Sequence, residues 1–365
     1  MLRQKKYGKF LWIFHLLIIT IFLASCHRAL PQKNVVTRLD KFDPMHIEVD
    51  PTGKLPPRFW DTYTLFEQAG TFFDAKQYDK AVEFYLKLVQ AYPNSETAPL
   101  ALFNAGLCYE ELQEWDKAII CYSQIQKNYP NKADRIELQT RQGTCLENKG
   151  DWKTARKIFI ETAEYWEATP IQRVEFRGRA AEALYFLGQI EDAEYELRNV
   201  EADYINFERG HVPYKKYFRA RLLFHLGEVY YAKFEAVSLA LPEEKLADQL
   251  EFKARLFILA REQYTKCILT YQKEWMTASL YKIGRGYEEF YHILHDAPLP
   301  NALSENEVME YKTKLEKKIA PALSKALEAY QQNIRLGADL KIDNQWIQMS
   351  QGRLKVLAPS EVPNP

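Results

Sequence analysis

The sequence lacks an excess of charge of either sign. Lysine and arginine together number 49, and so do aspartate and glutamate, which gives a formal net charge of zero at pH 7. Proteins that bind nucleic acids usually carry a strongly basic face. The charge balance therefore argues against a nucleic-acid partner, and we expect protein partners instead.

Long apolar runs are absent after the first 25 residues. No stretch of residues 26–365 approaches the 18 or more apolar residues that a membrane-spanning helix requires. We therefore expect no membrane span in this part of the chain.

Cysteine is scarce, and none of the five residues forms a CxxC pair. Cys108 and Cys145 lie 37 residues apart, at equivalent places of two successive repeats. Packed helices lie about 8–10 Å apart, which exceeds the Cα separation of a disulfide. We expect these two residues, together with Cys121 and Cys267, to be small buried apolar side chains.

Catalytic and cofactor motifs are missing as well. The sequence contains no HExxH, no P-loop and no nucleophile elbow, and Gly284-Arg-Gly286 lacks the third glycine of a dinucleotide loop. His292 and His295 share one helical face, as a metal site requires, but no third ligand is apparent. We predict no cofactor, no metal and no enzymatic activity.

The first 26 residues have the pattern of a secretory signal. Four basic residues precede an apolar run of 14 residues, Phe10–Leu23, which is too short to span a bilayer comfortably. Leu23-Ala-Ser-Cys26 follows and resembles the lipobox of bacterial lipoproteins. The resemblance implies that residues 1–25 are a signal peptide and that Cys26 carries acyl chains such as palmitate. The alternatives are an ordinary signal with a chance cysteine, or an uncleaved anchor.

The lipobox resemblance also predicts a location. Two or more acyl chains anchor a protein stably, whereas a single chain does not. The residue after Cys26 is His27 and not aspartate, which in lipoproteins of diderm bacteria favours the outer membrane. We therefore expect an outer-membrane, lipid-anchored protein that faces the periplasm. Residues 26–57 contain five prolines and predict an extended linker, and residues 358–365 predict a disordered tail.

The body of the chain repeats with a fixed period. The tetrapeptides that begin at Tyr78, Trp115, Trp152 and Ile190 each end in alanine, and these alanines are 37, 37 and 38 residues apart. A period in this range is typical of stacked repeats that bury their apolar faces against neighbours. Small and aromatic residues recur around each alanine, as at Gly106, Tyr109, Ala118 and Tyr122.

These residues resemble the tetratricopeptide repeat. The resemblance implies an all-α, right-handed superhelical solenoid of about six helix-turn-helix units over residues 58–357. Two later units are interrupted: Gly227 and Ala260 are 33 residues apart, and Gly284 and Ala326 are 42 apart, where 12 is normal. We predict helical insertions near residues 234–255 and 296–319. In the second, Ser304–Glu307 predicts a capping box before a charged helix that ends near Ile319.

The repeat resemblance suggests a binding face. In this family, partner segments lie along the first helix of each unit, on the concave face. By register, the residues carried over are Phe66, Phe73, Phe103, Glu110, Thr140, Glu147, Phe224 and Tyr231. Aromatics and carboxylates suit an extended or helical segment with apolar and basic side chains. The alternative is that some of these aromatics pack inside the stack.

The leading units resemble the BamD-like lipoproteins of outer-membrane protein assembly. The shared phrases are Tyr78-Asp-Lys-Ala with Tyr92-Pro-Asn-Ser, and Trp115-Asp-Lys-Ala with Tyr129-Pro-Asn. The resemblance implies a scaffold or adaptor in a cell-envelope complex. A lipoprotein of a gliding-motility or envelope-spanning trafficking machine is the alternative. A periplasmic enzyme or cell-wall-binding module has no supporting motif, and a polar pocket in the second insertion would favour it.

Overall fold

The computed structural model describes residues 46–48, 58–132, 134–239, 243–297 and 304–358. The predicted signal peptide, Cys26, most of the predicted linker and nearly all of the predicted tail lie outside these residues. The chain divides into two compact units, Met1–Leu65 and Phe66–Pro365.

The first unit contains a small antiparallel ribbon. Strand β1 (His46–Glu48) pairs with strand β2 (Arg58–Trp60), with Ile47 opposite Phe59. The described part of the predicted linker is thus extended. Helix α2 (Thr62–Asp74) begins in this unit, where the side chain of Asp61 accepts a hydrogen bond of 2.7 Å from the backbone N–H of Thr64.

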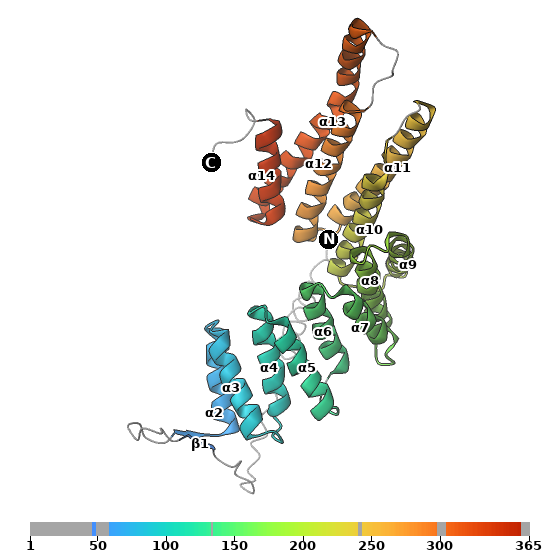
Figure 1. Cartoon of the computed structure of the whole chain (residues 1–365). Coiled ribbons are helices and arrows are strands. Elements are labelled where there is room, and N and C mark those ends of the chain that lie inside the picture. Colours follow the sequence, from blue (N-terminus) through green and yellow to red (C-terminus); the bar gives the residue numbers. More distant parts are fainter. Residues whose placement is uncertain (1–45, 49–57, 133, 240–242, 298–303, 359–365) are drawn as a thin grey trace, which may run out of the picture. The chain divides into compact units, whose positions relative to one another are not determined.

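The second unit is a stack of helices that follow one another in chain order (Figure 1). After α2 come α3 (Tyr78–Ala91), α4 (Ala98–Glu111), α5 (Trp115–Asn128), α6 (Arg135–Lys149), α7 (Trp152–Glu164), α8 (Pro170–Phe186), α9 (Ile190–Arg209), α10 (Lys216–Ala236), α11 (Glu243–Ile268), α12 (Lys273–His295), α13 (Glu305–Leu340) and α14 (Gln345–Leu357). From α3 onward each helix packs on the next. The prediction of stacked helix-turn-helix units is confirmed.

Within each unit the two helices meet at a glycine and a ring. A Cβ atom added to Gly106 would lie 2.5 Å from Cε1 of Tyr122, and one added to Gly227 would lie 2.5 Å from Cε1 of Tyr264. No real Cβ packs that closely, so the ring occupies the space that the missing side chain leaves. Gly143 with Phe159, and Gly284 with Tyr330, repeat this arrangement. We call this contact the glycine–ring joint.

The turn between α7 and α8 is closed by one arginine. The guanidinium of Arg173 donates hydrogen bonds of 2.9 Å to the carbonyl oxygens of Ala163 and Tyr165, and of 3.0 Å to that of Ala168. These bonds satisfy carbonyls that the end of α7 leaves without a partner. Helix α8 then begins with a capping box between Thr169 and Gln172 and with Pro170 as its first residue. The start of α8 is therefore held in a defined position.

The two predicted insertions are lengthened helices. Residues of the first insertion extend the end of α10 and the start of α11. In the second, Glu307 accepts hydrogen bonds from the backbone N–H and hydroxyl of Ser304, as the capping box predicted. The expectation of a separate helix that ends near Ile319 is wrong, because α13 continues through Pro321 to Leu340. Proline removes one backbone hydrogen bond, but a buried stripe that includes Ile319, Ala326 and Tyr330 continues on both sides of it.

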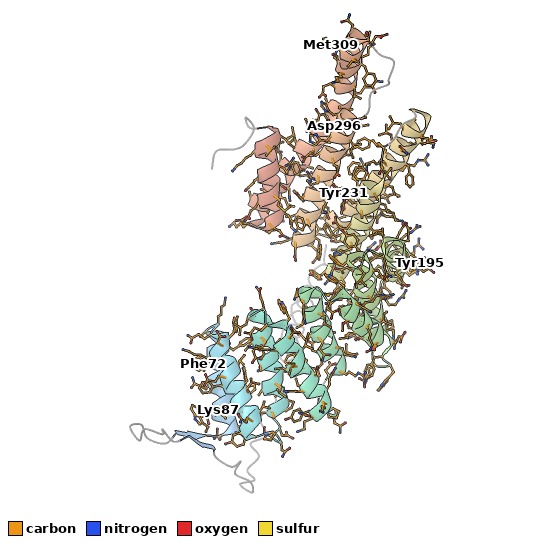
Figure 2. The ribbon with its side chains drawn as sticks, in the orientation of Figure 1. Phe72, Lys87, Tyr195, Tyr231, Asp296 and Met309 are labelled. Atoms are coloured by element: carbon orange, nitrogen blue, oxygen red, sulfur yellow. The ribbon has the colours of Figure 1, made fainter. Side chains whose placement is uncertain are left out.

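The first turns of α13 extend past the end of α12 (Figure 1). Met309, labelled in Figure 2, lies on this extension and is 69% exposed. The first contact back to α12 is the hydrogen bond of 3.0 Å from the Tyr291 hydroxyl to Glu316. The extension therefore projects from the stack by about two turns.

A buried lysine fixes the first lengthened hairpin. Lys253 on α11 donates hydrogen bonds to the carbonyl oxygens of Phe234 and Val237 at the end of α10. Burial lowers the pKa of Lys253, because the charged form is desolvated. The lysine supplies donors to the last carbonyls of α10, which have no partner within their own helix.

The four described cysteines are buried and free, as predicted. Burial raises the pKa of Cys121 to about 11 and that of Cys108 to about 12. Such thiols are inert, and they act as small apolar side chains in the stack.

Candidate functional site

Charged side chains join the first helices of successive units. In each first helix from α6 to α12, a basic residue stands two positions before the small residue that meets the second helix. These residues are Arg141, Arg179, His225 and Lys282. Each contacts a glutamate of the preceding first helix. We call this set of pairs the first-helix ladder.

The distances of the ladder are those of direct ion pairs. Nη1 of Arg141 lies 3.1 Å from Glu110, and Nε of Arg179 lies 3.1 Å from Glu147. Nε2 of His225 lies 3.1 Å from Glu182, and Nζ of Lys282 lies 2.7 Å from Glu228. The last rung differs in position, since Nε of Arg353 on α14 lies 3.1 Å from Glu288. Neighbouring units are therefore held by charge as well as by apolar packing.

Tyrosines of the glycine–ring joint support the ladder. The hydroxyl of Tyr122 donates to Glu110 at 2.6 Å, and that of Tyr264 donates to Glu228 at 2.5 Å. Burial, and then the hydrogen bond to Glu110, raise the pKa of Tyr122, so this hydroxyl stays a donor at neutral pH. The third unit has Phe159 in place of tyrosine, and the guanidinium of Arg179 lies over that ring, 4.1 Å from its centre.

Arg221 makes the centre of the ladder the most buried part. Its guanidinium donates to Glu182 at 2.7 and 2.8 Å and lies 3.1 Å from Glu147, so it joins α10 to both α8 and α6. Burial alone would raise the pKa of Glu182, but Arg221 and His225 outweigh it, and the pKa is lowered. The carboxylate therefore stays charged inside the stack.

His225 completes this centre with two contacts to acceptors. Its Nδ1 lies 2.9 Å from the carbonyl oxygen of Arg221, and its Nε2 lies 3.1 Å from Glu182. Both contacts are hydrogen bonds at once only if both ring nitrogens carry a proton.

The ladder uses two of the eight residues predicted to bind a partner. Glu110 and Glu147 are paired within the chain, so their charges are neutralised before any partner arrives. Phe224 is 5% exposed and Tyr231 is 6% exposed; Tyr231, labelled in Figure 2, donates its hydroxyl hydrogen bond to Glu289. These four side chains serve the packing of the stack.

The other four predicted residues are half-buried. The rings of Phe66, Phe73 and Phe103 lie against Tyr85, Tyr78 and Tyr122, respectively. The hydroxyl of Thr140 donates to the carbonyl oxygen of Ile136 at 2.6 Å. Of the eight residues, Thr140 is the one whose side chain lines a hollow.

That hollow is formed where α6, α8 and α10 begin. It encloses about 540 Å³, a volume typical of ligand sites. Its lining residues are Ile136, Glu137, Thr140, Thr169, Ile171, Gln172, Glu175, Phe176, Arg179, Pro213, Tyr214, Lys215 and Phe218. We call it the first-helix groove. The groove crosses the first helices of three consecutive units and presents apolar walls with a few polar groups.

One wall of the groove is the segment before α10. The hydroxyl of Tyr214 donates to Glu208 at 2.6 Å and accepts from Arg219 at 3.0 Å. Arg219 also donates to Glu201 on α9 at 2.9 Å. These bonds tie the segment to α9 and α10, so the wall is fixed in the absence of a partner.

Glu175 is the polar residue that the sequence analysis missed. Its carboxyl lines the groove, the residue is only 9% exposed, and it makes no hydrogen bond or ion pair with any described residue. Burial raises the pKa of Glu175, and the charge of Lys215 offsets this in part. Register arguments considered later positions of each first helix, whereas Glu175 stands six residues before Ala181, at the second position.

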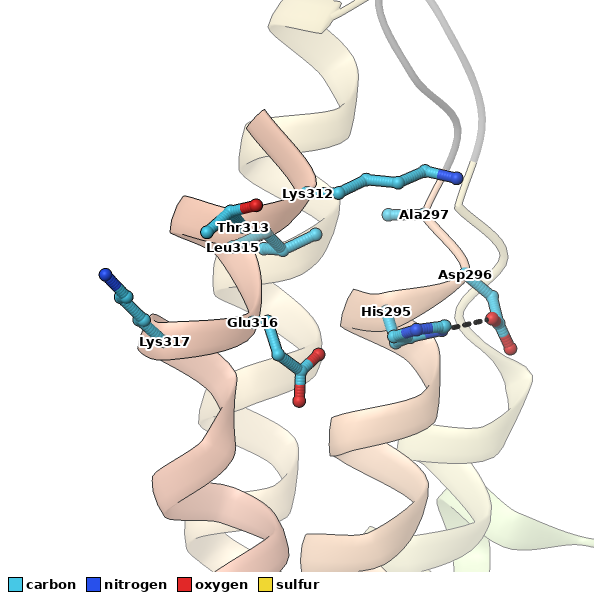
Figure 3. A pocket seen from close by; sticks show the side chains of 8 residues that line it. All are labelled: His295, Asp296, Ala297, Lys312, Thr313, Leu315, Glu316 and Lys317. Atoms are coloured by element: carbon cyan, nitrogen blue, oxygen red, sulfur yellow. Dashed lines mark hydrogen bonds and ion pairs between the residues drawn. The ribbon is translucent and has the colours of Figure 1, made fainter. Parts of the chain in front are cut away.

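A second hollow lies in the second insertion (Figure 3). It encloses about 720 Å³ between the end of α12 and α13 and is lined by His295, Asp296, Ala297, Lys312, Thr313, Leu315, Glu316 and Lys317. Nδ1 of His295 lies 2.8 Å from Asp296, but the two side chains are 54% and 73% exposed. The hydroxyl of Thr313 donates to the carbonyl oxygen of Met309 in its own helix. The lining residues thus bring no nucleophile together with a base.

Metal and membrane sites were sought in the same residues. Across the described parts of the chain, no group of three histidine, cysteine or acidic residues is placed to hold a metal ion. His292 lies 3.9 Å from Glu288, and His295 contacts Asp296. Nor does any described helix combine the length and hydrophobicity needed to cross a bilayer.

Comparison with known families agrees with the repeat pattern. The tetratricopeptide repeat model matches residues 63–95 and 100–132. These segments cover α2 to α5 and most of the turns between them. The chain therefore contains tetratricopeptide repeats, as its tetrapeptide period predicted. The search of curated protein sequences found no match.

Solved structures of repeat proteins resemble the chain at low identity. The C-terminal part of a TPR repeat-containing protein from Cytophaga hutchinsonii is 15% identical, with 81% of this chain and 96% of that chain covered and a TM-score of 0.43. YrrB, described as a TPR protein with an unusual peptide-binding site, is 18% identical, with 55% and 90% covered and a TM-score of 0.34. MamA from Desulfovibrio magneticus RS-1 is 14% identical, with 56% and 98% covered and a TM-score of 0.36.

Proposed function

We propose that this chain is a lipid-anchored adaptor of the cell envelope, which binds a segment of a protein partner in the first-helix groove. The observation that carries the proposal is the groove itself. It runs across the first helices of three consecutive units and is lined by apolar side chains and a small number of polar ones. Such a composition is typical of sites that take an extended or helical segment.

The ladder prepares the groove for binding. Arg179 lines the groove and is held by Glu147 and by the hydroxyl of Thr144, at 2.8 Å from the latter. Tyr214 is held by Glu208 and Arg219. Because these side chains are already ordered, a partner loses less conformational entropy on binding than it would on a mobile surface.

The apolar walls supply the anchoring surface. Ile136, Ile171, Phe176 and Phe218 come from three different helices and face one hollow. Buried apolar contacts near the centre of an interface usually provide most of its binding energy. We expect two or more apolar side chains of the partner to enter this hollow.

The envelope location is part of the proposal. Its support is the signal-like start of the chain and Leu23-Ala-Ser-Cys26, which would place acyl chains on Cys26. His27 favours the outer membrane, and the body would then face the periplasm. Within that setting we propose a role in outer-membrane protein assembly, as the phrases shared with BamD-like lipoproteins suggest.

In-cell photo-crosslinking tests the binding proposal. A photoreactive amino acid at Ile171 lies in the groove, and one at Ile120, which is exposed on α5, is the control. We expect Ile171 to capture a partner that Ile120 does not. A β-barrel insertase subunit in that product would support the assembly role. Motility or trafficking components would contradict that role, and identical products at both positions would contradict the groove.

A separate experiment tests the anchor. The Cys26→Ser variant cannot be lipidated, so we expect it in the soluble periplasmic fraction while the wild type fractionates with the outer membrane. If the variant fractionates as the wild type does, the anchor proposal fails, whatever the groove binds.

A further inference from the structure

We infer that the first-helix groove recognises a lysine or arginine side chain of its partner through Glu175, with apolar side chains of the same segment on the groove walls. The inference rests on the proposed binding in the groove and adds the chemistry that the partner must have. It starts from a contrast among the buried glutamates of the chain.

Six glutamates are buried among the described residues, and five of them accept a hydrogen bond from a basic side chain. The pairs are Glu147 with Arg179, Glu182 with Arg221, Glu201 with Arg219, Glu228 with Lys282, and Glu288 with Arg353. Glu175 is the sixth, and no described residue donates to it. The stack therefore pairs its buried carboxylates with cations wherever they serve packing, and Glu175 departs from that rule where it faces the groove.

A buried carboxylate without a partner is costly. Its charged form loses water and receives no hydrogen bond in return. The raised pKa of Glu175 has this cause. A ligand that donates to the carboxylate would relieve the cost, so binding energy is available at this position that the free protein does not use.

The charged groups around Glu175 do not take the place of a ligand. Arg179 also lines the groove, but its guanidinium is occupied by Glu147 and Thr144. Glu137 is paired with Arg141. Lys215 is exposed at the rim and acts on Glu175 through its charge alone, without an ion pair within 4 Å.

A second polar group near Glu175 also lacks a partner. The hydroxyl of Tyr204 is buried and makes no hydrogen bond to the described residues. After burial itself, the charge of Glu175 is the largest cause of the raised pKa of Tyr204. Two neighbouring polar side chains are thus unsatisfied on the same side of the groove, which is what a site awaiting donors would show.

A basic side chain fits this position better than a neutral donor. Hydrogen bonds between two charged groups are about twice as strong as those between neutral groups. The long apolar stems of lysine and arginine would also lie along Phe176 and the other groove walls. The occupant we propose is therefore a polypeptide segment in which apolar residues flank a lysine or arginine.

A peptide selection tests the inference directly. The probe is a library of random 12-residue peptides displayed on phage and selected against the full chain in detergent. Three proteins are compared: the wild type, Glu175→Gln, and Glu83→Gln, whose exchange removes an exposed glutamate on α3 far outside the groove lining. Crosslinking from Ile171 identifies which selected peptides occupy the groove.

We expect groove-bound peptides from the wild type and from Glu83→Gln to be enriched in lysine or arginine between apolar residues. The Glu175→Gln protein should lose this preference. A synthetic peptide of the enriched type should bind Glu175→Gln about 10-fold more weakly or worse, and exchange of its basic residue for methionine should then have no further effect.

Other outcomes separate this inference from the proposed function. Groove-bound peptides without a basic residue, or a basic preference that survives in Glu175→Gln, would overturn the inference and leave the groove as a binding site. Peptides that fail to crosslink from Ile171 would overturn the proposed site itself. Glutamine has the shape of glutamate, and a thermal unfolding curve for each protein shows that any lost binding is not lost folding.

Discussion

The regular helices α4 to α7 and the lengthened helices α10 to α13 solve the same packing problem with different amounts of chain. The former have 13 to 15 residues each, and the latter have 21 to 36. Yet Gly106 meets Tyr122 as Gly227 meets Tyr264, with the same 2.5 Å approach of an added Cβ. The added length lies at the far end of each hairpin, beyond the joint. A unit of this stack is therefore defined by its joint and its rung of the ladder, and not by its length.

The largest expected effect comes from the residue that connects the two regions. Arg221 joins α10 to Glu147 on α6 and Glu182 on α8. Its exchange for methionine leaves two buried carboxylates with fewer partners, and we expect the free energy of unfolding in urea to fall by about 3–5 kcal/mol.

Lys149→Met is the matched control for Arg221→Met. Lys149 pairs with Asp116 between neighbouring units, but both side chains are exposed. We expect a change of about 0–1 kcal/mol. Equal effects of the two exchanges would show that the buried centre of the ladder contributes no more than a surface pair does.

Acid should act differently on the wild type and on Arg221→Met. The pKa of Glu182 is lowered in the folded protein, so its contribution to stability is present above the pKa of the unfolded state and disappears as pH falls through the folded value. Without Arg221 this loss should begin at a higher pH. Urea unfolding at several pH values measures it, and identical acid profiles would contradict the role given to Arg221.

The joint is expected to be equally intolerant in both regions. Gly106→Ala and Gly227→Ala each place a Cβ against a buried tyrosine ring, and we expect a loss of about 1–3 kcal/mol in either case. Gly70→Ala on α2 is the control, because no atom lies within 4 Å of its added Cβ. There the exchange should stabilise by about 0.5–1 kcal/mol. A loss in one region only would show that the joint is not shared.

The lengthened region has one support of its own, the lysine at the end of α10. Lys253→Met leaves the carbonyl oxygens of Phe234 and Val237 without their donor, which we expect to cost about 1–3 kcal/mol. Hydrogen exchange should quicken at the end of α10 and stay unchanged in α4 to α7. Lys266→Met, at an exposed site of the same helix, is the control. Unchanged exchange near Phe234 would contradict the capping role.

The smallest expected effect is a gain in stability. The pKa of Glu175 is raised in the folded protein, so folding is penalised once pH rises above the pKa of the unfolded state. Glu175→Gln should therefore be slightly more stable than the wild type at neutral pH, and the difference should vanish in acid, where the glutamate is protonated in both states. Thermal unfolding at both pH values checks this, and a destabilised variant would show that the carboxylate already has a partner.

Much of the fold could be predicted from the sequence, because the joint uses residue types with narrow roles. A glycine or alanine followed at a fixed distance by an aromatic ring indicates a close helix crossing, and the structure has these crossings. The lengths of α11 and α13 could not be predicted in the same way. Pro321 suggests a helix boundary, and only the apolar stripe on both sides of it, which is buried against α12 and α14, keeps the helix intact.

The candidate site was harder to predict than the fold. Glu110 and Glu147 stand where partner-binding residues are expected, but Arg141 and Arg179, which neutralise them, lie 31 and 32 residues further along the chain. The recurring basic residue two positions before each small residue was the available signal for these pairs. No such pattern marks Glu175, since its significance is the absence of a partner, and an absence of contacts is visible only in three dimensions.

The spacing of the ladder along the chain has a consequence for how the protein folds. Arg141 and Glu110 are separated by 31 residues, whereas Lys282 and Glu228 are separated by 54, because the first insertion lies between them. Closing the longer loop costs about 0.5 kcal/mol more in chain entropy, and its contacts form more slowly. The regular units should thus nucleate first and offer their exposed edge to the lengthened hairpins, so that the chain folds from its shorter loops toward its longer ones.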